Sequence, residues 1–329
     1  MKDHPHPLTI EAHAETWPLR EAFKISRGSK TAAHVIVATV TDGQFTGRGE
    51  AVPYARYNET VDAALNAIAG LGSIANRTAL ESAMPPGAAL NAVDCAFWDF
   101  EAKRQGVSAA ALAGRTTALK PVTTAFTLSL DTPDAMAIMA KSVINLPLLK
   151  LKLGGEGDAA RMQAVRDARP DARLIADANE AWTFDMLAEL TATAARLGFE
   201  TIEQPLPEAD DEALRGTRWP LSICADESAR TAADLPRLQG LYDSVNIKLD
   251  KAGGLTGALA LHKQARAIGL KIMVGSMVAS SLAAAPALIL AQDAEWVDLD
   301  GPLLLTRDRD DGLHIVDGVI HPPTRALWG

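Results

Sequence analysis

The sequence predicts an α/β barrel of parallel strands that follows a smaller α+β region. From Val122 onward, eight short β-rich runs alternate with Ala- and Leu-rich helical segments, which is typical of βα units in a parallel sheet. Nearly every run ends in a polar residue, and positions 152, 177, 203, 226 and 248 follow one another at steps of 25, 26, 23 and 22 residues. Each step fits one strand, loop and helix, and eight such strands favour a closed barrel over an open sheet.

The predicted elements fall into an α+β region, residues 1–120, and a barrel, residues 121–311. In the first region, residues 34–42 and 44–51 predict a hairpin around an Asp42-Gly43 turn. Residues 88–104 repeat apolar side chains at helical spacing. The eight barrel strands are expected in the runs VTTAFTLSL, LLKLKL, LIADAN, TIEQP, SICADE, SVNIKL, KIMVGS and WVDLDG.

The composition indicates a globular protein that acts on small molecules. Its 329 residues are 48% hydrophobic and carry a formal net charge of -9 without a Lys/Arg-rich run, which excludes nucleic acid and an anionic membrane as main partners. Cys95 and Cys224 lie in apolar stretches and are expected to be buried thiols of a reducing, cytoplasmic compartment. The N-terminus lacks the apolar core of a signal peptide, and His4 and His6, between prolines, are expected to be solvated.

Two lysines share one strand face in the run LLKLKL. Side chains alternate along a strand, so Lys150 and Lys152 point to one side and the leucines to the other. If the leucines face the helices, both lysines point into the barrel. The alternative is an exposed edge strand on which lysines discourage aggregation, but the neighbouring runs are apolar and βα-connected.

Three acids end three successive strands and predict a metal site. Asp177, Glu203 and Asp226 each follow an apolar run, and carboxylates gathered at one barrel end repel one another unless a proton or a cation lies between them. An all-oxygen set without His or Cys favours Mg²⁺. The alternative is that each acid caps a helix or forms a loop salt bridge.

Lys248 alternates with Ile247 and Leu249, which places it inside the barrel, opposite Lys150 and Lys152. A carboxylate held on Mg²⁺ acidifies the neighbouring C–H bond, because the charge that develops on its oxygens lies at the cation. We expect the pKa of one lysine to be lowered by burial and by the neighbouring cations, so that this lysine acts as base while the opposite one donates a proton.

These motifs together resemble the enolase superfamily in its muconate-lactonising branch. The resemblance rests on K-x-K, D-A-N, E-Q-P, A-D-E-S and N-I-K-L-D-K-A-G-G, and on the helix VDCAFWDFEAKRQG. It implies a (β/α)7β modified TIM barrel with an N-terminal α+β capping domain, to which residues 312–329 are expected to return. It also implies Asp177, Glu203 and Asp226 as Mg²⁺ ligands, Lys152 and Lys248 as the acid/base pair, and Lys150 as an electrostatic helper.

The last strand, V-D-L-D-G-P, is similar to the D-x-D signature of dipeptide epimerases, above all the Ala-Glu epimerases. Asp298 and Asp300 at i and i+2 are expected to face the same side of the strand and to bind the ammonium group of a dipeptide. The alternative is a salt bridge to an arginine such as Arg307.

The remaining substrate contacts are expected from the capping region and from other strand ends. Phe23 and Arg27 are predicted to lie on a loop that closes over the ligand, as are Arg56 and Tyr57, and Arg27 is the preferred clamp for a distal carboxylate. Solvated arginines on mobile loops are the alternative. Thr127, Ser276 and Met277, near the ends of the first and seventh strands, complete the predicted substrate-binding set.

The resemblance therefore predicts a Mg²⁺-dependent isomerase that epimerises a dipeptide, with L-Ala-D/L-Glu from cell-wall peptides as the leading substrate and a homo-oligomer as a possible assembly. An o-succinylbenzoate synthase, an N-acylamino acid racemase or a muconate cycloisomerase would use the same lysines and metal. The non-enzymatic alternative is a catalytically silent barrel that serves as a binding scaffold.

Overall fold

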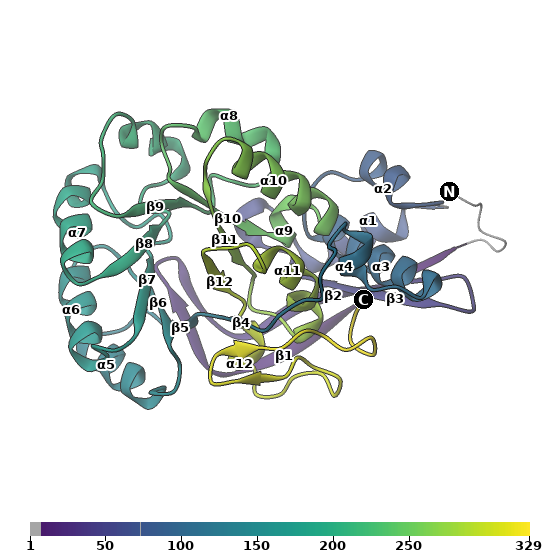
Figure 1. The fold of residues 1–329 in the computed structure, drawn as a ribbon, viewed down its shortest axis with the longest axis horizontal. Coiled ribbons are helices and arrows are strands. Elements are labelled where there is room, and N and C mark those ends of the chain that lie inside the picture. The colour runs from purple at the N-terminus through teal and green to yellow at the C-terminus, as the bar shows by residue number, and fades with distance from the viewer. Residues whose placement is uncertain (1–7, 73) are drawn as a thin grey trace.

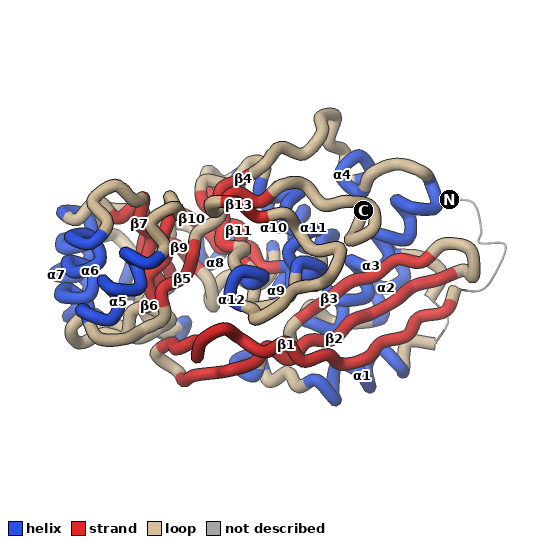
Figure 2. Tube along the Cα trace, turned by 90° about the horizontal axis from the view of Figure 1, so that it is seen from below, coloured by secondary structure: helices blue, strands red, loops and turns tan. Residues whose placement is uncertain are grey.

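A parallel barrel and an antiparallel sheet lie side by side in the computed structural model, which describes residues 8–72 and 74–329 (Figure 1). His4 and His6 lie outside the described residues. The antiparallel sheet runs along one side of the molecule beneath the barrel (Figure 2). This arrangement confirms the predicted α/β barrel with an N-terminal α+β cap.

Eight parallel strands form the barrel in chain order, from β5 to β12. The ring is closed by a hydrogen bond from Ala125 N, next to β5, to Val297 O of β12, at 2.7 Å. Each of the eight predicted runs overlaps one barrel strand, and the first run also contains the short strand β4 (Val122–Thr123). The strands are β5 (Phe126–Leu128), β6 (Leu148–Lys152), β7 (Arg173–Asp177), β8 (Phe199–Glu203), β9 (Ser222–Ala225), β10 (Ser244–Lys248), β11 (Lys271–Gly275) and β12 (Trp296–Asp298).

Helices cover the outside of the barrel and bury apolar side chains against it. In α7 (Phe184–Arg196), for example, Leu187, Leu190 and Ala194 are buried, at the spacing of one helical face. The β8–β9 connection carries a 3₁₀ helix, η2 (Glu208–Leu214), in place of an α-helix. The other elements are α5 (Pro133–Ser142), α6 (Asp158–Ala168), η3 (Ala232–Asp234), α8 (Leu235–Leu238), α9 (Leu249–Ala252), α10 (Leu255–Ala267), α11 (Ser281–Ala291) and α12 (Gly301–Leu304).

The cap consists of a three-stranded antiparallel sheet packed on helix α3 (Ala88–Gln105). Helix α3 lies so close to β3 that a Cβ atom on Gly47 or Gly49 would come within about 2.2 Å of its backbone oxygens, so only glycine fits there. The remaining elements are β1 (Thr9–Ile25), β2 (Gly28–Thr41), β3 (Thr46–Ala51), η1 (Ala55–Tyr57), α1 (Val61–Ala69), α2 (Arg77–Ala83) and α4 (Ala109–Leu112).

The expected hairpin is formed by β2 and β3, but strand β1 was not predicted. Its ladder with β2 shifts register between Pro18 and Phe23, so polar and apolar side chains alternate poorly along it. The placement of Phe23 on a loop was therefore wrong: Phe23 lies on β1, opposite Lys30 of β2. The tip of this β1–β2 hairpin reaches the barrel near β6 and β7 (Figure 1).

The C-terminal segment crosses the amino-terminal end of the barrel, opposite the cavity, and returns to the cap. Strands β13 (Ile315–Val316) and β14 (Val319–Ile320) form a small sheet with β4 (Val122–Thr123). Beyond them, the indole of Trp328 donates to Cys95 O of α3 at 3.0 Å. We propose domain boundaries at 1–120 and 121–311, with residues 312–329 completing the cap.

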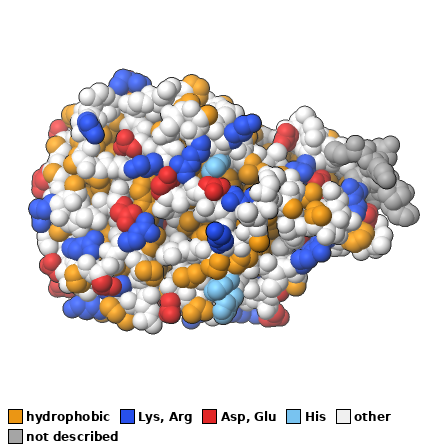
Figure 3. Space-filling model, viewed as in Figure 1, with side chains coloured by type: hydrophobic (Ala, Val, Ile, Leu, Met, Phe, Trp, Pro, Cys, Tyr) orange, Lys and Arg blue, Asp and Glu red, His pale blue; other side chains and the backbone are white. Residues whose placement is uncertain are grey.

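The charges of the surface are mixed in sign. On the face shown in Figure 3, Lys and Arg side chains are interspersed with Asp and Glu. Within the described part of the chain, none of the helices has the length and apolarity needed to cross a membrane.

Candidate active site

A cavity of about 480 Å³ lies between the carboxyl ends of the barrel strands and the β1–β2 hairpin. Most of the predicted site residues line it. Asp177 and Glu203 do not, because they lie beneath its floor and are completely buried. The predicted residues that line the cavity are Phe23, Arg27, Arg56, Tyr57, Thr127, Lys150, Lys152, Asp226, Lys248, Ser276, Met277, Asp298 and Asp300.

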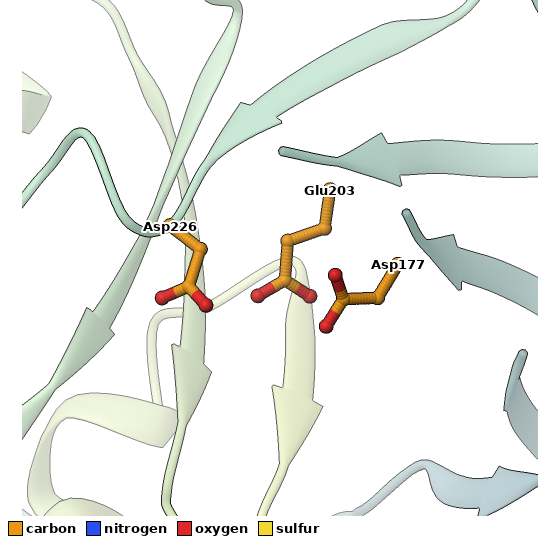
Figure 4. A group of neighbouring side chains, drawn as sticks. All are labelled: Asp177, Glu203 and Asp226. Carbon is orange, nitrogen blue, oxygen red and sulfur yellow. The ribbon is translucent and has the colours of Figure 1, made fainter. Parts of the chain in front are cut away.

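The three predicted metal ligands converge below the cavity. Asp177 and Glu203 are the last residues of β7 and β8, Asp226 follows β9, and their side chains point toward one another (Figure 4). One oxygen from each carboxylate lies within 4.8 Å of the other two. Burial, together with the charges of Asp177 and Asp226, raises the pKa of Glu203 to about 8. Such crowded oxygen ligands fit a divalent cation, whose charge offsets their repulsion.

Lys152 and Lys248 flank this acid cluster from opposite sides. They end β6 and β10, which lie four strands apart in the eight-stranded ring. The three acids lie at the carboxyl ends of the three strands between them, β7, β8 and β9. Lys152 Nζ lies 2.6 Å from Asp177 Oδ2, and Lys248 Nζ lies 2.8 Å from Asp226 Oδ2. Both lysines reach the cavity, although each is less than 10% exposed. A carbon atom held between them can therefore exchange a proton with either.

The expected lowering of a lysine pKa is not seen at Lys248. Burial alone would lower its pKa, but the carboxylates of Asp226 and Glu203 overcome this and hold it well above its ordinary value. The expectation assumed that a cation had already neutralised these carboxylates. In the structure the nearest positive charges to the Asp226 carboxylate are the ammonium groups of Lys251, at 2.6 Å, and Lys248, at 2.8 Å.

Lys150 lies one layer deeper in the barrel and contacts three acids. Its Nζ is 2.5 Å from Glu203 Oε2, 2.7 Å from Asp298 Oδ2 and 3.2 Å from Asp177 Oδ2. These carboxylates keep its pKa well above the ordinary value, although burial opposes them. Lys150 thus links the acid cluster to Asp298, which was predicted to bind substrate.

Two further side chains hold the acid cluster in place and were missed by the sequence analysis. Asn246 Nδ2 donates to Glu203 Oε1 at 2.6 Å, and Lys251 Nζ donates to Asp226 Oδ1 at 2.6 Å and to Asn246 O at 3.0 Å. Both residues are buried. The position of Asn246, two residues before Lys248 on an inward strand face, was a usable signal. Lys251 lies on α9, where the strand alternation gives no information.

Asp298 and Asp300 lie together at the cavity, but only Asp298 is on a strand. The expectation of two side chains on one strand face was wrong, because β12 ends at Asp298 and Asp300 caps α12. Asp300 Oδ2 accepts from Thr127 N at 2.6 Å. Asp298 Oδ1 is buried and has no hydrogen-bond partner among the described residues. Arg307 lies over the Trp17 ring instead of pairing with either acid.

The predicted clamp residue Arg27 is already engaged by the barrel. Its Nη2 donates to Glu227 Oε1 at 2.6 Å, and its Nη1 donates to Asn179 O at 2.8 Å and to Glu180 Oε2 at 3.0 Å. Arg56, which the structure places in the 3₁₀ helix η1 with Tyr57, also pairs with Glu180. These contacts attach the cap to the loops that follow β7 and β9.

Two family models match the chain and together span most of it. The model described as "Mandelate racemase / muconate lactonizing enzyme, N-terminal domain" matches residues 8–114, and the model "Enolase C-terminal domain-like" matches residues 136–326. The second match alone covers more than half of the chain.

Two of the similar proteins are named for activity on glutamate derivatives. The chain is 44% identical over 320 residues to the L-Ala-D/L-Glu epimerase of Escherichia coli K12, covering 95% of this chain and 99% of that one. It is 44% identical over 301 residues to an N-acetyl-D-glutamate racemase of Pseudoalteromonas, covering 90% and 95%. It also superposes, with a TM-score of 0.93 and 45% identity, on an Agrobacterium tumefaciens enolase family member with bound sodium and L-Ala-L-Glu, covering 98% and 100%.

Proposed function

This chain belongs to the mandelate racemase and muconate lactonizing enzyme family of the enolase superfamily, and we propose that it is a Mg²⁺-dependent dipeptide epimerase. Its reaction is proton transfer at the α-carbon of the C-terminal residue, with L-Ala-D/L-Glu as the substrate. The observation that carries this proposal is the pair Lys152 and Lys248 on opposite sides of one acid cluster.

The two lysines invert the α-carbon because one removes a proton from one face and the other donates a different proton to the opposite face. A neutral amine of one lysine takes the α-proton, and the ammonium of the other donates a proton to the opposite face of the planar carbon. The carboxylates of Asp177, Glu203 and Asp226 would hold Mg²⁺. The chemistry that this cation supplies is stabilisation of the negative charge that develops on the substrate carboxylate.

The unpaired oxygen of Asp298 supports a substrate with a free ammonium group. A buried carboxylate oxygen without a donor is costly, and a substrate N–H can satisfy it. Asp300 adds a second carboxylate at the same end of the cavity. A dipeptide places its ammonium one peptide unit away from the reacting carbon, whereas a free amino acid is too short to reach both the lysines and these aspartates.

Racemisation of an N-acylated glutamate is the second candidate function, because one relative at 44% identity is an N-acetyl-D-glutamate racemase. The same lysines and acids would serve that reaction. An acylated nitrogen, however, brings no positive charge to Asp298 and Asp300.

The proposal is tested by α-proton exchange in D₂O, measured for a dipeptide library and for N-acetyl-glutamate. We expect exchange and epimerisation of L-Ala-L-Glu in the presence of Mg²⁺, with little exchange of N-acetyl-glutamate. Preferred exchange of N-acetyl-glutamate would show that the chain is an N-acylated glutamate racemase. A lack of exchange with every compound would favour the catalytically silent binding scaffold.

A further inference from the structure

One positive charge at the cavity has no ion-pair partner among the described residues. Among the cations that line the cavity, Lys150, Lys152 and Lys248 contact the buried acids, while Arg27 and Arg56 pair with Glu180 or Glu227. Lys30 is the exception: within the described part of the chain, no carboxylate oxygen lies within ion-pair distance of its ammonium. The Lys30 ammonium lies over the Phe23 ring, and its Nζ is 5.7 Å from the ring centroid.

The ladder of the β1–β2 hairpin directs Lys30 toward the reacting centre. Lys30 lies opposite Phe23, so the two side chains share the face that lines the cavity. The same ring lies 5.8 Å from Lys152 Nζ. Lys30 is thus near enough to the acid/base pair to contact the side chain of a substrate held there.

The surroundings of Lys30 favour an anionic ligand. Partial burial and the positive charges of Lys152 and Lys248 lower the pKa of Lys30 to about 8, so it is still mainly charged at neutral pH. Asp250 attracts it only from a distance, because the Asp250 carboxylate accepts from Val52 N and Asn91 Nδ2. A half-buried ammonium without an ion-pair partner is stabilised most by a carboxylate that arrives with the substrate.

The substituents of the substrate α-carbon leave one direction for its side chain. The proton must face Lys152 or Lys248, the carboxylate must face the acid cluster, and the nitrogen must lead toward Asp298 and Asp300. The remaining substituent points to the cap, where Phe23 and Lys30 line the cavity.

Resting on the proposed function, we propose that Lys30 determines specificity by binding the side-chain carboxylate of the substrate's C-terminal residue. Arg27 is instead a positioning residue that holds the hairpin on the barrel. Its guanidinium donates to Glu227, Glu180 and Asn179 O, and it would have to leave these contacts to reach a substrate. The substrate class is therefore a dipeptide with an acidic C-terminal residue.

The test compares L-Ala-L-Glu with L-Ala-L-Gln, which have the same shape but differ in charge. In Lys30→Met we expect kcat/KM for L-Ala-L-Glu to fall about ten- to a hundredfold, as for loss of a charge-assisted contact, while L-Ala-L-Gln changes little. Lys30→Arg should keep the preference for glutamate. Arg27→Met, the matched control, should lower kcat/KM for both substrates by a similar factor.

The inference is overturned if Lys30→Met leaves the Glu/Gln ratio of kcat/KM unchanged, or if Arg27→Met alone abolishes that ratio. Lys30→Gln provides the same comparison if the methionine variant does not fold. A native protein that exchanges no α-proton of any glutamyl compound would contradict the proposed function itself, which is a different result from an unchanged ratio in an active enzyme.

Discussion

The floor of the cavity and the β1–β2 hairpin above it are built in opposite ways. On the floor, Asp177, Glu203 and Asp226 are buried, and Asn246 and Lys251 hold their oxygens by short hydrogen bonds. On the hairpin, no residue from 20 to 30 is buried. The tip of the hairpin is fixed by side-chain contacts such as those of Arg27 and by an ion pair between Lys24 and Asp131.

This difference assigns separate tasks to the two regions. Side chains fixed by strands and by neighbouring hydrogen bonds hold reacting atoms in place, so we propose that the floor determines the reaction. A half-exposed hairpin can change its side chains without disturbing the barrel, so we propose that it determines which substrate is accepted. Substitutions on the floor should therefore affect all substrates alike. Substitutions of residues that contact the substrate's ammonium group or side chain should affect some substrates more than others.

Removal of the metal should have the largest effect. We expect exhaustive chelation to abolish turnover of every dipeptide, and Mg²⁺ to restore it, because the carboxylates of the floor then repel one another and no cation stabilises the developing charge. The measurement is α-proton exchange before and after dialysis against EDTA, with circular dichroism to show that the fold persists. Full turnover after chelation would remove the metal from the proposed mechanism.

Replacement of a catalytic lysine should be nearly as severe but stereochemically uneven. Lys152→Ala and Lys248→Ala should each lower the epimerisation rate by about 10²- to 10⁴-fold, the usual contribution of a general base. Each lysine serves one face of the α-carbon, so each variant should retain exchange in D₂O for one epimer only. Equal residual exchange from both epimers in both variants would contradict the two-base mechanism.

The strand ends could be predicted from the sequence because they follow a regular rule. Lys152, Asp177, Glu203 and Lys248 each complete a buried strand of alternating or apolar residues, and parallel strands bring such ends together. Asp300 does not lie at a strand end, because β12 ends two residues earlier, at Asp298, and Asp300 is the N-cap residue of α12. The position along the sequence was right, but the assumption of one continuous strand was not.

The hairpin could not be predicted in the same way. Strand β1 contains Pro18 and several charged residues, and its register shift interrupts the alternation that identifies strands. Lys30, in R-G-S-K, looks like a solvated turn residue, and only the pairing with Phe23 shows that it faces the cavity. Arg27 was expected to bind substrate because its loop was predicted to close over the ligand. Its partners, Glu180 and Glu227, lie about 150 and 200 residues away, so the sequence did not reveal them.

Loss of one substrate-binding carboxylate should have a smaller and selective effect. Asp300→Asn should lower kcat/KM for L-Ala-L-Glu about ten- to a hundredfold, because one charge-assisted contact to the ammonium is lost. N-acetyl-L-Ala-L-Glu has no ammonium group, so it should be a poor substrate of the native enzyme and should change little in the variant. An equal loss for both compounds would show that Asp300 acts on the fold of the site and not on the ammonium.

The smallest effect should be the pH dependence of folding stability and of substrate binding that Asp300 causes. Asp300 differs here from Asp177 and Asp226, because its pKa is raised and theirs are lowered. Burial, and then the charge of Asp298, raises the pKa of Asp300 from 3.8 to about 7, whereas the pKa values of Asp177 and Asp226 are lowered. As pH falls through 7, the folded protein protonates Asp300 before the unfolded chain does. The contribution of this group to folding stability therefore increases toward pH 4 and is lost as pH rises through about 7.

Substrate binding should change in the opposite direction, because only the ionised carboxylate attracts an ammonium group. For a free-amine dipeptide, log kcat/KM should decline below pH 7 with a slope of about one, since this parameter reports the free enzyme. Asp300→Asn should remove the inflection while raising the thermal midpoint of unfolding slightly at pH 8, where the native carboxylate is charged and buried. Glu227, whose pKa burial and the Asp226 charge raise to about 7, is a second group at the cavity that titrates near this pH. An inflection that persists in Asp300→Asn but disappears in Glu227→Gln would show that the pH dependence comes from Glu227. It would then reflect the ion pair between Glu227 and Arg27, which holds the hairpin on the barrel, and not the binding of the ammonium group.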